Sequence, residues 1–384
     1  MLKIHYSLES DLQNGITDIA APEALSIQVR NLVLKTAKRK KVVRGEVIAE
    51  HPAKFGGAHH AACAGTVSDV DYHHLAIKCS GEEEGVEPVD VKSLAPGLEM
   101  LRALQGLGID CAVLSSPADI LVINGLNPEP GISVVEQLLK DERETLEAGL
   151  ELARKLIRPE KVILAEAKGD TFSLAGVENR YIKPKYPNSL DALVVRKITG
   201  KEFPSDTKVM SVMDLYDLGR VAMTGLPVTD TVMTIGDRNY RVPLGTPIRH
   251  ILSTLGMEAK SGDTVVLGGS FRGEAVYSLD EGVKKGDHAL FAIGSHVFPA
   301  VQDATCINCG ECVLNCPGRI MPNLISRYAE YEMFEMAEKY GLNSCFECGL
   351  CAFSCTARRP LLQYIRFAKA QLKASRQSEQ SQGL

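Results

Sequence analysis

The sequence predicts a multidomain α/β protein, with a small β domain first, an α/β core, a β-grasp (SLBB-like) module and a C-terminal α-helical domain. Three observations lead to this prediction. Short apolar segments fill the first part of the chain, a strand–loop–helix–strand pattern follows, and most of the 11 cysteines gather near the end. We place the domains at residues 1–95, 96–226, 227–299 and 300–374, and expect residues 375–384 to be a disordered tail.

The first domain is expected to be a small β-barrel or sandwich. Its strands are short runs bounded by glycine or charged residues, at 41–49, 63–70 and 74–79. The basic run at residues 38–41 could dock an acidic partner, but a solvated turn is the simpler interpretation.

Two further groups of residues are interpreted as structural. Adjacent histidines on a strand point to opposite faces, so neither pair offers two metal ligands on one side. These histidines are His59, His60, His73 and His74. A buried free thiol is the default for the cysteines outside the C-terminal region, which are Cys63, Cys79 and Cys111.

The α/β core begins with a strand at 120–124, followed by a loop at 125–131. A long helix then keeps one face apolar until Ile157, Pro159 stops it, and residues 161–165 supply the next, parallel strand. Ligands of such cores bind beyond the carboxyl ends of the strands, so a nucleotide or flavin would be sought at the loop 125–131.

The third domain resembles a β-grasp module between residues 227 and 293. Its helix is well marked, with Thr246 as N-cap, Pro247 at the first helical position and Gly256 just past the end. Four strands surround it, at 231–235, 240–242, 265–267 and 275–277.

The C-terminal domain contains the same cysteine motif twice, from Cys306 to Cys316 and from Cys345 to Cys355. Three cysteines at Cys-x-x-Cys-x-x-Cys spacing wrap one iron-sulfur cube, and in two-cluster ferredoxins the trailing cysteine of each run binds the other cube. The pattern therefore predicts two 4Fe-4S clusters. The ligands of the first are Cys306, Cys309, Cys312 and Cys355, and those of the second are Cys345, Cys348, Cys351 and Cys316.

Two other uses of these cysteines are possible. All-cysteine zinc sites also use Cys-x-x-Cys pairs, but they do not need a third cysteine at the next interval or a proline such as Pro317 after the fourth. Disulfides are the weaker alternative, because no apolar signal peptide opens the chain and a reducing compartment is expected. One helix is expected between Asn323 and Gly341, and another from Pro360 through Lys373.

Charge and composition exclude two classes of function. There are 43 basic and 48 acidic residues, for a net charge of -5, and no apolar stretch is long enough to cross a bilayer. Tryptophan is absent and aromatic residues make up 5% of the chain. We therefore expect no nucleic-acid partner and no transmembrane segment of its own.

Several motifs resemble the C subunit of the Rnf electron transport complex. They run almost from end to end and comprise Gly65-Thr-Val67, Ile123-Asn-Gly125, Glu129-Pro130, Lys185-Tyr-Pro187, Gly245-Thr-Pro-Ile248, both cysteine runs and Gln363-Tyr364. The resemblance implies an α/β core similar to the flavin- and NADH-binding subunit of respiratory complex I. It also implies a peripheral subunit on the cytoplasmic side of the bacterial inner membrane. Its partners would be the membrane subunits of an ion-translocating complex and a redox protein such as a ferredoxin or cytochrome.

The flavin-binding motifs of that family are altered. The family's glycine-rich loop, G-x-G-G-A-G-F-P, corresponds to residues 106–114, which lack its core, and the first glutamate of its acidic loop is Asn127. Two further segments have lost glycines, at 186–191 and at 211–214. Leu190 and Met213 would place side chains where a flavin or nicotinamide should lie. We therefore predict that the chain neither binds FMN nor oxidises NADH.

The sequence leads to an electron-relay subunit without a catalytic acid, base or nucleophile of its own. The main alternative is an FMN-containing subunit that oxidises NADH and feeds the clusters, with Glu129 and Asp191 near the nicotinamide. A zinc-binding scaffold is a third alternative. Arg319, Arg358 and Arg359 either tune the clusters by their charge or interact with helix ends and water.

Overall fold

The computed structural model describes residues 6–10, 12, 14–82, 84–167, 172–202, 204–297, 301–302 and 304–382. The chain forms two compact units. The first comprises residues 1–269 and 274–293, and the second comprises residues 270–273 and 294–384. None of the described helices is long and apolar enough to span a membrane.

The first part of the first unit contains two antiparallel sheets, which agrees with the expected β architecture. One has the strand order β2-β8-β7-β4 and the other the order β3-β5-β6. Alternate residues such as Leu75 and Ile77 point into the core between them. The strands are β2 Ala24–Gln28, β3 Val33–Leu34, β4 Lys41–Val42, β5 Val47–Glu50, β6 His59–His60, β7 Gly65–Val70 and β8 His74–Cys79.

A disulfide joins Cys63 to Cys79 in this part of the chain. Cys63 precedes β7, whose Gly65 lies opposite Cys79 in the antiparallel pairing with β8, so the pairing brings the two sulfurs together. The expectation of free thiols is therefore wrong for this pair. Cys111, by contrast, is free and fully buried, and burial raises the pKa of its thiol to about 12.

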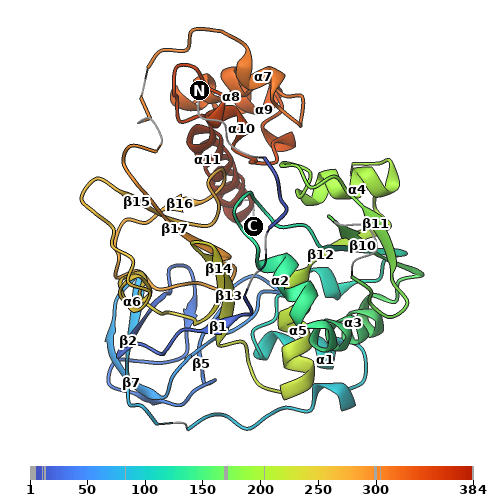
Figure 1. The fold of residues 1–384 in the computed structure, drawn as a ribbon, viewed down its shortest axis with the longest axis vertical. Coiled ribbons are helices and arrows are strands. Elements are labelled where there is room, and N and C mark those ends of the chain that lie inside the picture. Colours follow the sequence, from blue (N-terminus) through green and yellow to red (C-terminus); the bar gives the residue numbers. More distant parts are fainter. Residues whose placement is uncertain are drawn as a thin grey trace. The chain divides into compact units, whose positions relative to one another are not determined.

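The α/β core is built on a parallel sheet with the order β11-β10-β9-β12. Leu121 and Ile123 point to the face covered by α3 and α5, and Val122 points to the face covered by α4 (Figure 1). The strands are β9 Ile120–Asn124, β10 Lys161–Glu166, β11 Glu178–Tyr181 and β12 Thr207–Ser211. The helices are η1 Val91–Ser93, α1 Leu98–Gly106, η2 Val113–Ser115, α2 Val134–Asp141, α3 Arg143–Ile157, α4 Asp191–Thr199 and α5 Val212–Thr224.

The single long helix expected before Ile157 is two helices, α2 and α3. Glu142 separates them with φ -118, and its carboxylate accepts a hydrogen bond from the Thr145 hydroxyl at 2.9 Å and lies 3.5 Å from Arg241. The helical end before Pro159 is confirmed, because Arg158 takes the left-handed conformation there.

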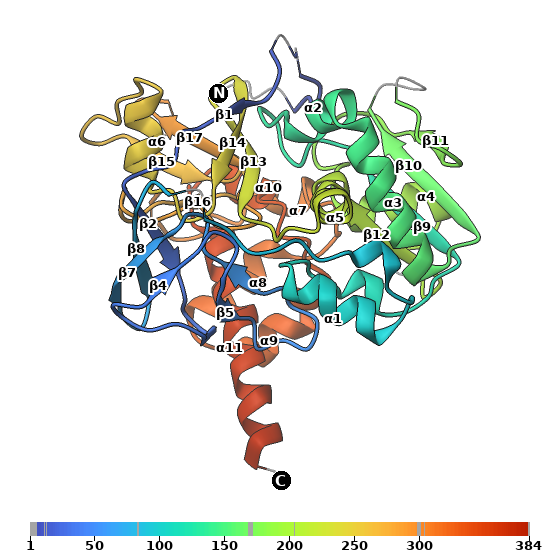
Figure 2. The ribbon, with the colours of Figure 1, turned by 90° about the horizontal axis from the view of Figure 1, so that it is seen from below.

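A six-stranded sheet with the order β1-β14-β13-β17-β15-β16 completes the first unit (Figure 2). Its assignment as a β-grasp module stays a prediction. Thr246 is not the N-cap of α6: Pro247 occupies that position, and the buried Thr246 hydroxyl donates to the Pro243 carbonyl at 2.7 Å. The elements are β1 Thr17–Asp18, β13 Asp230–Ile235, β14 Arg238–Pro243, α6 Ile248–Thr254, β15 Thr264–Leu267, β16 Glu274–Ala275 and β17 Ala289–Ile293.

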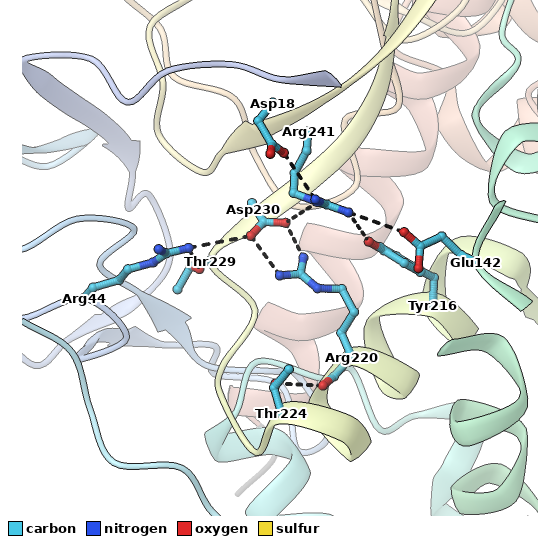
Figure 3. Close-up of polar contacts among 9 residues, drawn as sticks. All are labelled: Asp18, Arg44, Glu142, Tyr216, Arg220, Thr224, Thr229, Asp230 and Arg241. Carbon is cyan, nitrogen blue, oxygen red and sulfur yellow. Dashed lines mark hydrogen bonds and ion pairs between the residues drawn. The ribbon is translucent and has the colours of Figure 1, made fainter. Parts of the chain in front are cut away.

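A buried carboxylate, Asp230, links the sheets and helices of the first unit (Figure 3). Its side chain is 6% exposed and accepts two hydrogen bonds from Arg220. Arg241, on β14, lies 3.8 Å away, and Arg44, between β4 and β5, lies 4.0 Å away. Arg241 also contacts Asp18 at 3.2 Å. One anion thus joins three cations from separate parts of the chain.

The second unit is helical. Two helices, α8 and α9, occur where one was expected, because Glu332 between them has φ 57. The last helix, α11, continues to Gln382, so the expected disorder from residue 375 does not hold for the helical stretch; no glycine or proline interrupts it before Gly383. The elements are α7 Glu311–Leu314, α8 Pro322–Glu330, α9 Phe334–Lys339, η3 Leu342–Ser344, α10 Leu350–Phe353 and α11 Leu361–Gln382.

Candidate functional site

Eight cysteines of the second unit surround two cavities. Three cysteines of one run and the trailing cysteine of the other line each cavity. The sequence predicts the same two sets as the ligands of two clusters, and that ligand assignment stays a prediction. The first cavity is lined by Cys306, Cys309, Cys312 and Cys355, and the second by Cys345, Cys348, Cys351 and Cys316.

The electrostatics of the thiols follow the same grouping. Burial raises the pKa of Cys312, and the neighbouring thiolates of Cys355, Cys306 and Cys309 raise it further, while the backbone N–H of Asn323 opposes the rise. Within each set, ionised thiols therefore oppose one another at close range. Bound iron removes that cost, because its positive charge stabilises all the thiolates together.

The second set behaves in the same way. Burial and the nearby thiolates of Cys348, Cys345 and Cys316 raise the pKa of Cys351. Burial raises the pKa of Cys348 to about 11. Without a bound cation, these sulfurs would stay protonated at neutral pH.

Backbone geometry explains how a short loop surrounds each cavity. Asn308 and Glu347, between the first and second cysteines of their runs, have φ 55 and 54. Gly310 and Gly349 then have φ 83 and 75 and begin the one-turn helices that carry the third cysteines. Left-handed residues of this kind turn successive backbone N–H groups toward an anionic centre.

Hydrogen bonds reach the sulfurs directly. The backbone N–H of Glu347 lies 3.4 Å from Cys345 Sγ, and that of Arg359 lies 3.4 Å from Cys355 Sγ. Such bonds stabilise thiolate charge and tune the potential of a bound cluster.

The three arginines of interest occupy different environments. Arg359 lines the first cavity, is 4% exposed, and donates to the Ala304 carbonyl at 2.6 Å as well as pairing with Glu330. Arg319 and Arg358 are exposed and have φ 53. Arg359 is therefore the one arginine of the three whose charge is fixed beside a cavity.

Single-ion metal sites have a different geometry. Among the residues that the structure describes, no group of three or more His, Cys, Asp or Glu side chains lies close enough together to hold one metal ion. Sulfurs around a single zinc ion at about 2.3 Å are mutual neighbours, whereas sulfurs around an iron-sulfur cube are kept apart by the cube.

The second candidate region is the carboxyl edge of the parallel sheet. In the flavoprotein alternative, Glu129 and Asp191 would lie near the nicotinamide here. The structure brings both to this edge. Asn124, at the end of β9, donates to Asp191 Oδ1 at 2.7 Å and to the Ser189 carbonyl at 2.8 Å. The Ser189 hydroxyl donates to the Pro128 carbonyl at 2.9 Å. Glu129 is 4% exposed.

Little space remains beside Glu129. A Cβ added at Gly269 would lie 2.2 Å from its carboxyl group, so the backbone of that glycine lies directly against it. Leu190, which replaces a glycine of the family, is 6% exposed and packed, and Met213 is partly buried against the core.

An amino-terminal segment, Tyr6 to Ser10, crosses this edge. The Tyr186 N–H donates to the Tyr6 carbonyl at 2.7 Å, and the Leu8 N–H donates to the Pro184 carbonyl at 2.9 Å. The Asn127 amide donates to the Leu8 carbonyl at 2.8 Å, and Leu8 is 1% exposed. The segment is thus held at this edge by hydrogen bonds to the loops around Pro184, Tyr186 and Asn127.

Sequence reasoning missed this segment. Its only signal is a single apolar residue, Leu8, between polar neighbours. One isolated residue predicts neither a helix nor a strand.

The remaining altered stretches are also engaged by the chain itself. Gly106 accepts a hydrogen bond at its carbonyl from His60 Nε2 at 2.8 Å, and the Gly108 carbonyl accepts one from Lys285. Ser211 caps α5 by accepting a hydrogen bond from the Asp214 N–H at 3.0 Å.

Known proteins resemble both the cysteine region and most of the rest of the chain. Residues 299–356 match the family described as "4Fe-4S dicluster domain". The chain is 24% identical over 392 residues to the C subunit of the "Proton-translocating ferredoxin:NAD(+) oxidoreductase complex" of Clostridium ljungdahlii, covering 90% of this chain and 86% of that protein. It is 30% identical over 277 residues to the C subunit of the "Ion-translocating oxidoreductase complex" of Pasteurella multocida, covering 66% of this chain.

These relatives confirm the resemblance to the Rnf C subunits that the sequence predicts. The C subunit of the ion-translocating complex of Pectobacterium atrosepticum is 28% identical over 416 residues, which are 94% of this chain. The chain spans only 33% of the length of the Pasteurella protein and 60% of that of Pectobacterium. Among solved structures, an NAD+-reducing nickel-iron hydrogenase in its H2-reduced state matches 69% of this chain and 60% of its own, with 14% identity and a TM-score of 0.43.

Proposed function

We propose that this chain is a peripheral electron-transfer subunit of a membrane-bound Rnf-type ion-translocating oxidoreductase complex, and that it relays electrons through two 4Fe-4S clusters. The observation that carries the proposal is the pair of four-cysteine cavities, each completed by the trailing cysteine of the other run. Each cluster would take up and release one electron at a time.

The chain's own residues supply the cradle for this chemistry. Backbone N–H groups at Glu347 and Arg359 would stabilise the thiolates, and buried aliphatic side chains such as Leu361 and Leu362 beside the cavities would keep water away. Crossed ligation holds the two cavities next to each other, since Cys312 and Cys316 lie one helical turn apart. Electrons would pass between neighbouring cubes.

The test is metal and sulfide analysis of the chain purified without oxygen. We expect iron and acid-labile sulfide in equal amounts, with a broad visible absorbance that dithionite bleaches. Stoichiometric zinc without sulfide would support the zinc scaffold and reject the relay.

We further propose that the carboxyl edge of the α/β sheet holds neither FMN nor NADH. Three features of the edge support this: the segment around Leu8 crosses it, Leu190 is packed where the family has glycine, and the backbone of Gly269 closes on Glu129. A flavin would have to displace hydrogen bonds that the chain makes with itself.

The competing function is an NADH-oxidising flavoprotein. Anaerobic incubation of the purified chain with excess FMN, followed by gel filtration, should leave no flavin absorbance on the protein, and NADH should not bleach the clusters. Bound FMN together with NADH-dependent bleaching would establish the alternative, with Glu129 and Asp191 as the first residues to substitute.

The proposed partners are the other subunits of the Rnf-type complex and one redox protein, a ferredoxin or a cytochrome. The proposed location is the cytoplasmic side of the bacterial inner membrane. Copurification of the chain with membrane subunits after mild solubilisation tests both statements, because a chain that stays entirely in the wash would contradict them.

A further inference from the structure

The two cysteine loops are repeats of one motif, so corresponding positions can be compared directly. We call residues 306–316 the first loop and residues 345–355 the second loop. Ile307 corresponds to Phe346, Asn308 to Glu347, Gly310 to Gly349 and Leu314 to Phe353.

The outer side of the second loop is covered by the chain itself. A Cβ added at Gly349 would lie 2.1 Å from the carbonyl oxygen of Phe271, so the segment Ser270–Gly273 rests directly on it. The Phe271 ring meets the Phe353 ring edge-on, with 5.3 Å between centroids. Phe271 is 7% exposed as a result.

Helix α11 fixes the same loop by charge. Lys369 lies 2.7 Å from the Glu347 carboxylate and donates to the Cys345 carbonyl at 2.8 Å, and Arg366 lies 3.2 Å from Glu347. The second loop therefore has a completed outer surface.

Among the residues that the structure describes, none covers the first loop in this way. Apart from the glycine's own chain neighbours, no described atom lies within 4 Å of a Cβ added at Gly310. Leu314 is 80% exposed, against 37% for Phe353, and Ile307 is 62% exposed. Asn308 is exposed, and its side-chain oxygen lies 3.7 Å from Cys306 Sγ of its own loop.

The sulfurs differ in the same sense. Cys309 is exposed, and its sulfur lies 3.7 Å from the Thr356 hydroxyl. Its counterpart Cys348 is buried. Electron tunnelling weakens steeply with distance, so a partner protein would exchange electrons most readily across the first loop.

We propose that the exposed face of the first loop, formed by Ile307, Cys309, Gly310 and Leu314, is the docking surface for an electron-transfer protein. The partner places an apolar side chain on Gly310 and Leu314 in the way that Phe271 covers Gly349 and Phe353. This inference rests on the proposed electron-relay function and adds to it which cluster faces the partner.

Charge defines the partner's surface further. Two exposed charges of opposite sign are described here, Glu311 within the loop and Arg358, two residues after the Thr356 that contacts Cys309. A strongly charged partner gains little from such a face. The matching surface is therefore apolar at its centre and close to neutral, and docking depends only weakly on salt.

The first experiment uses a photo-reactive benzoylphenylalanine in place of Leu314, with the same replacement at Tyr331 as control. Tyr331 is 71% exposed in the same unit, but lies past the far end of α8. Membranes holding the assembled complex are irradiated and the products identified by mass spectrometry. The proposal expects a product between position 314 and a protein that carries a flavin, haem or iron-sulfur group. No product, or one with a protein lacking such a group, would overturn it.

The second experiment compares Leu314→Asp with Tyr331→Asp in the complex. After reduction with dithionite, the clusters should pass electrons to the docked partner protein. We expect this re-oxidation to be about tenfold slower in Leu314→Asp, with little dependence on salt. The Tyr331→Asp control should match the unsubstituted chain, and both variants should retain the full cluster spectrum. An unchanged rate with intact clusters rejects the docking face, whereas absence of clusters from the unsubstituted chain rejects the electron-relay function itself.

Discussion

The cysteine loops and the carboxyl edge of the parallel sheet are both places where a protein of this architecture can hold a cofactor. The two regions differ in whether the chain itself provides partners for their polar groups. Around the cysteine cavities, thiols are brought together although burial and neighbouring thiols raise the pKa of some of them, as for Cys351 beside Cys348. At the sheet edge, Asn124 and Asn127 are hydrogen-bonded to the chain's own groups. Groups gathered at an electrostatic cost indicate a site for a ligand, and groups satisfied internally indicate structure.

The two regions should therefore respond differently to substitution. Substitutions around the cysteines should remove a cofactor, whereas substitutions in the α/β core and its neighbours should cost folding stability and leave the cofactor content unchanged. Substitutions in the two regions test that division.

The largest effect is expected from Cys316→Ser and Cys355→Ser. If ligation is crossed, Cys316→Ser removes the cluster of the Cys345 run and Cys355→Ser removes that of the Cys306 run. EPR of the anaerobically reduced variants, compared with Cys111→Ser as a control thiol, checks this. Loss of the cluster of its own run in either variant would contradict crossed ligation.

Asp230→Ala should be the most damaging change in the first unit. It leaves Arg220 and its neighbours without their buried anion, which costs about 3–5 kcal/mol of folding stability. Asp18→Ala is the matched control, because this exposed partner of Arg241 should cost less than about 1 kcal/mol. Denaturant unfolding followed by circular dichroism measures both, and the iron content should not change in either variant.

Leu8→Ala tests the segment that crosses the sheet edge. Removing this fully buried side chain should cost about 3 kcal/mol, while Leu98→Ala, at an exposed position, should be nearly neutral. Fluorescence titration with FMN should show no binding to either variant. If the Leu8→Ala protein kept its stability and bound FMN, the sheet edge would be a flavin-binding site, which contradicts the proposal.

His60 gives a smaller, pH-dependent effect. Gly106 O can only accept, so Nε2 carries the proton, and burial lowers the pKa of His60 from 6.5 to about 4. The unfolded chain therefore binds a proton that the folded chain refuses, and stability falls as the pH drops below 6.5. The expected loss is about 2 kcal/mol between pH 6.5 and 5.

The control for this titration is His60→Gln, whose amide can still donate to the Gly106 carbonyl. His59 shifts in the same direction, so the difference between the two proteins isolates His60. Equal slopes of stability against pH in both would show that His60 does not contribute.

The parts of the fold that were predicted from sequence depend on local patterns. The apolar run of β9 is visible within a few neighbouring residues, so the bounds of this strand were predicted from the sequence. The cysteine spacing is local in the same way. The groups that line each cavity follow from the same spacing.

The parts that were not predicted depend on contacts between distant residues. The break at Glu142 involves Arg241, about 100 positions away, and Cys63 meets Cys79 only because β7 and β8 pair. The segment at Leu8 has no local pattern and is fixed by Asn127 and Pro184. Single-sequence reasoning sees residue types and spacing, and these contacts are set by the completed fold.

The most direct test of an electron relay through two clusters is EPR spin counting on the anaerobically purified chain, with iron and flavin measured on the same sample. We predict two reduced 4Fe-4S centres, about eight iron atoms per chain and no flavin. One centre, zinc in place of iron, or stoichiometric FMN would contradict it.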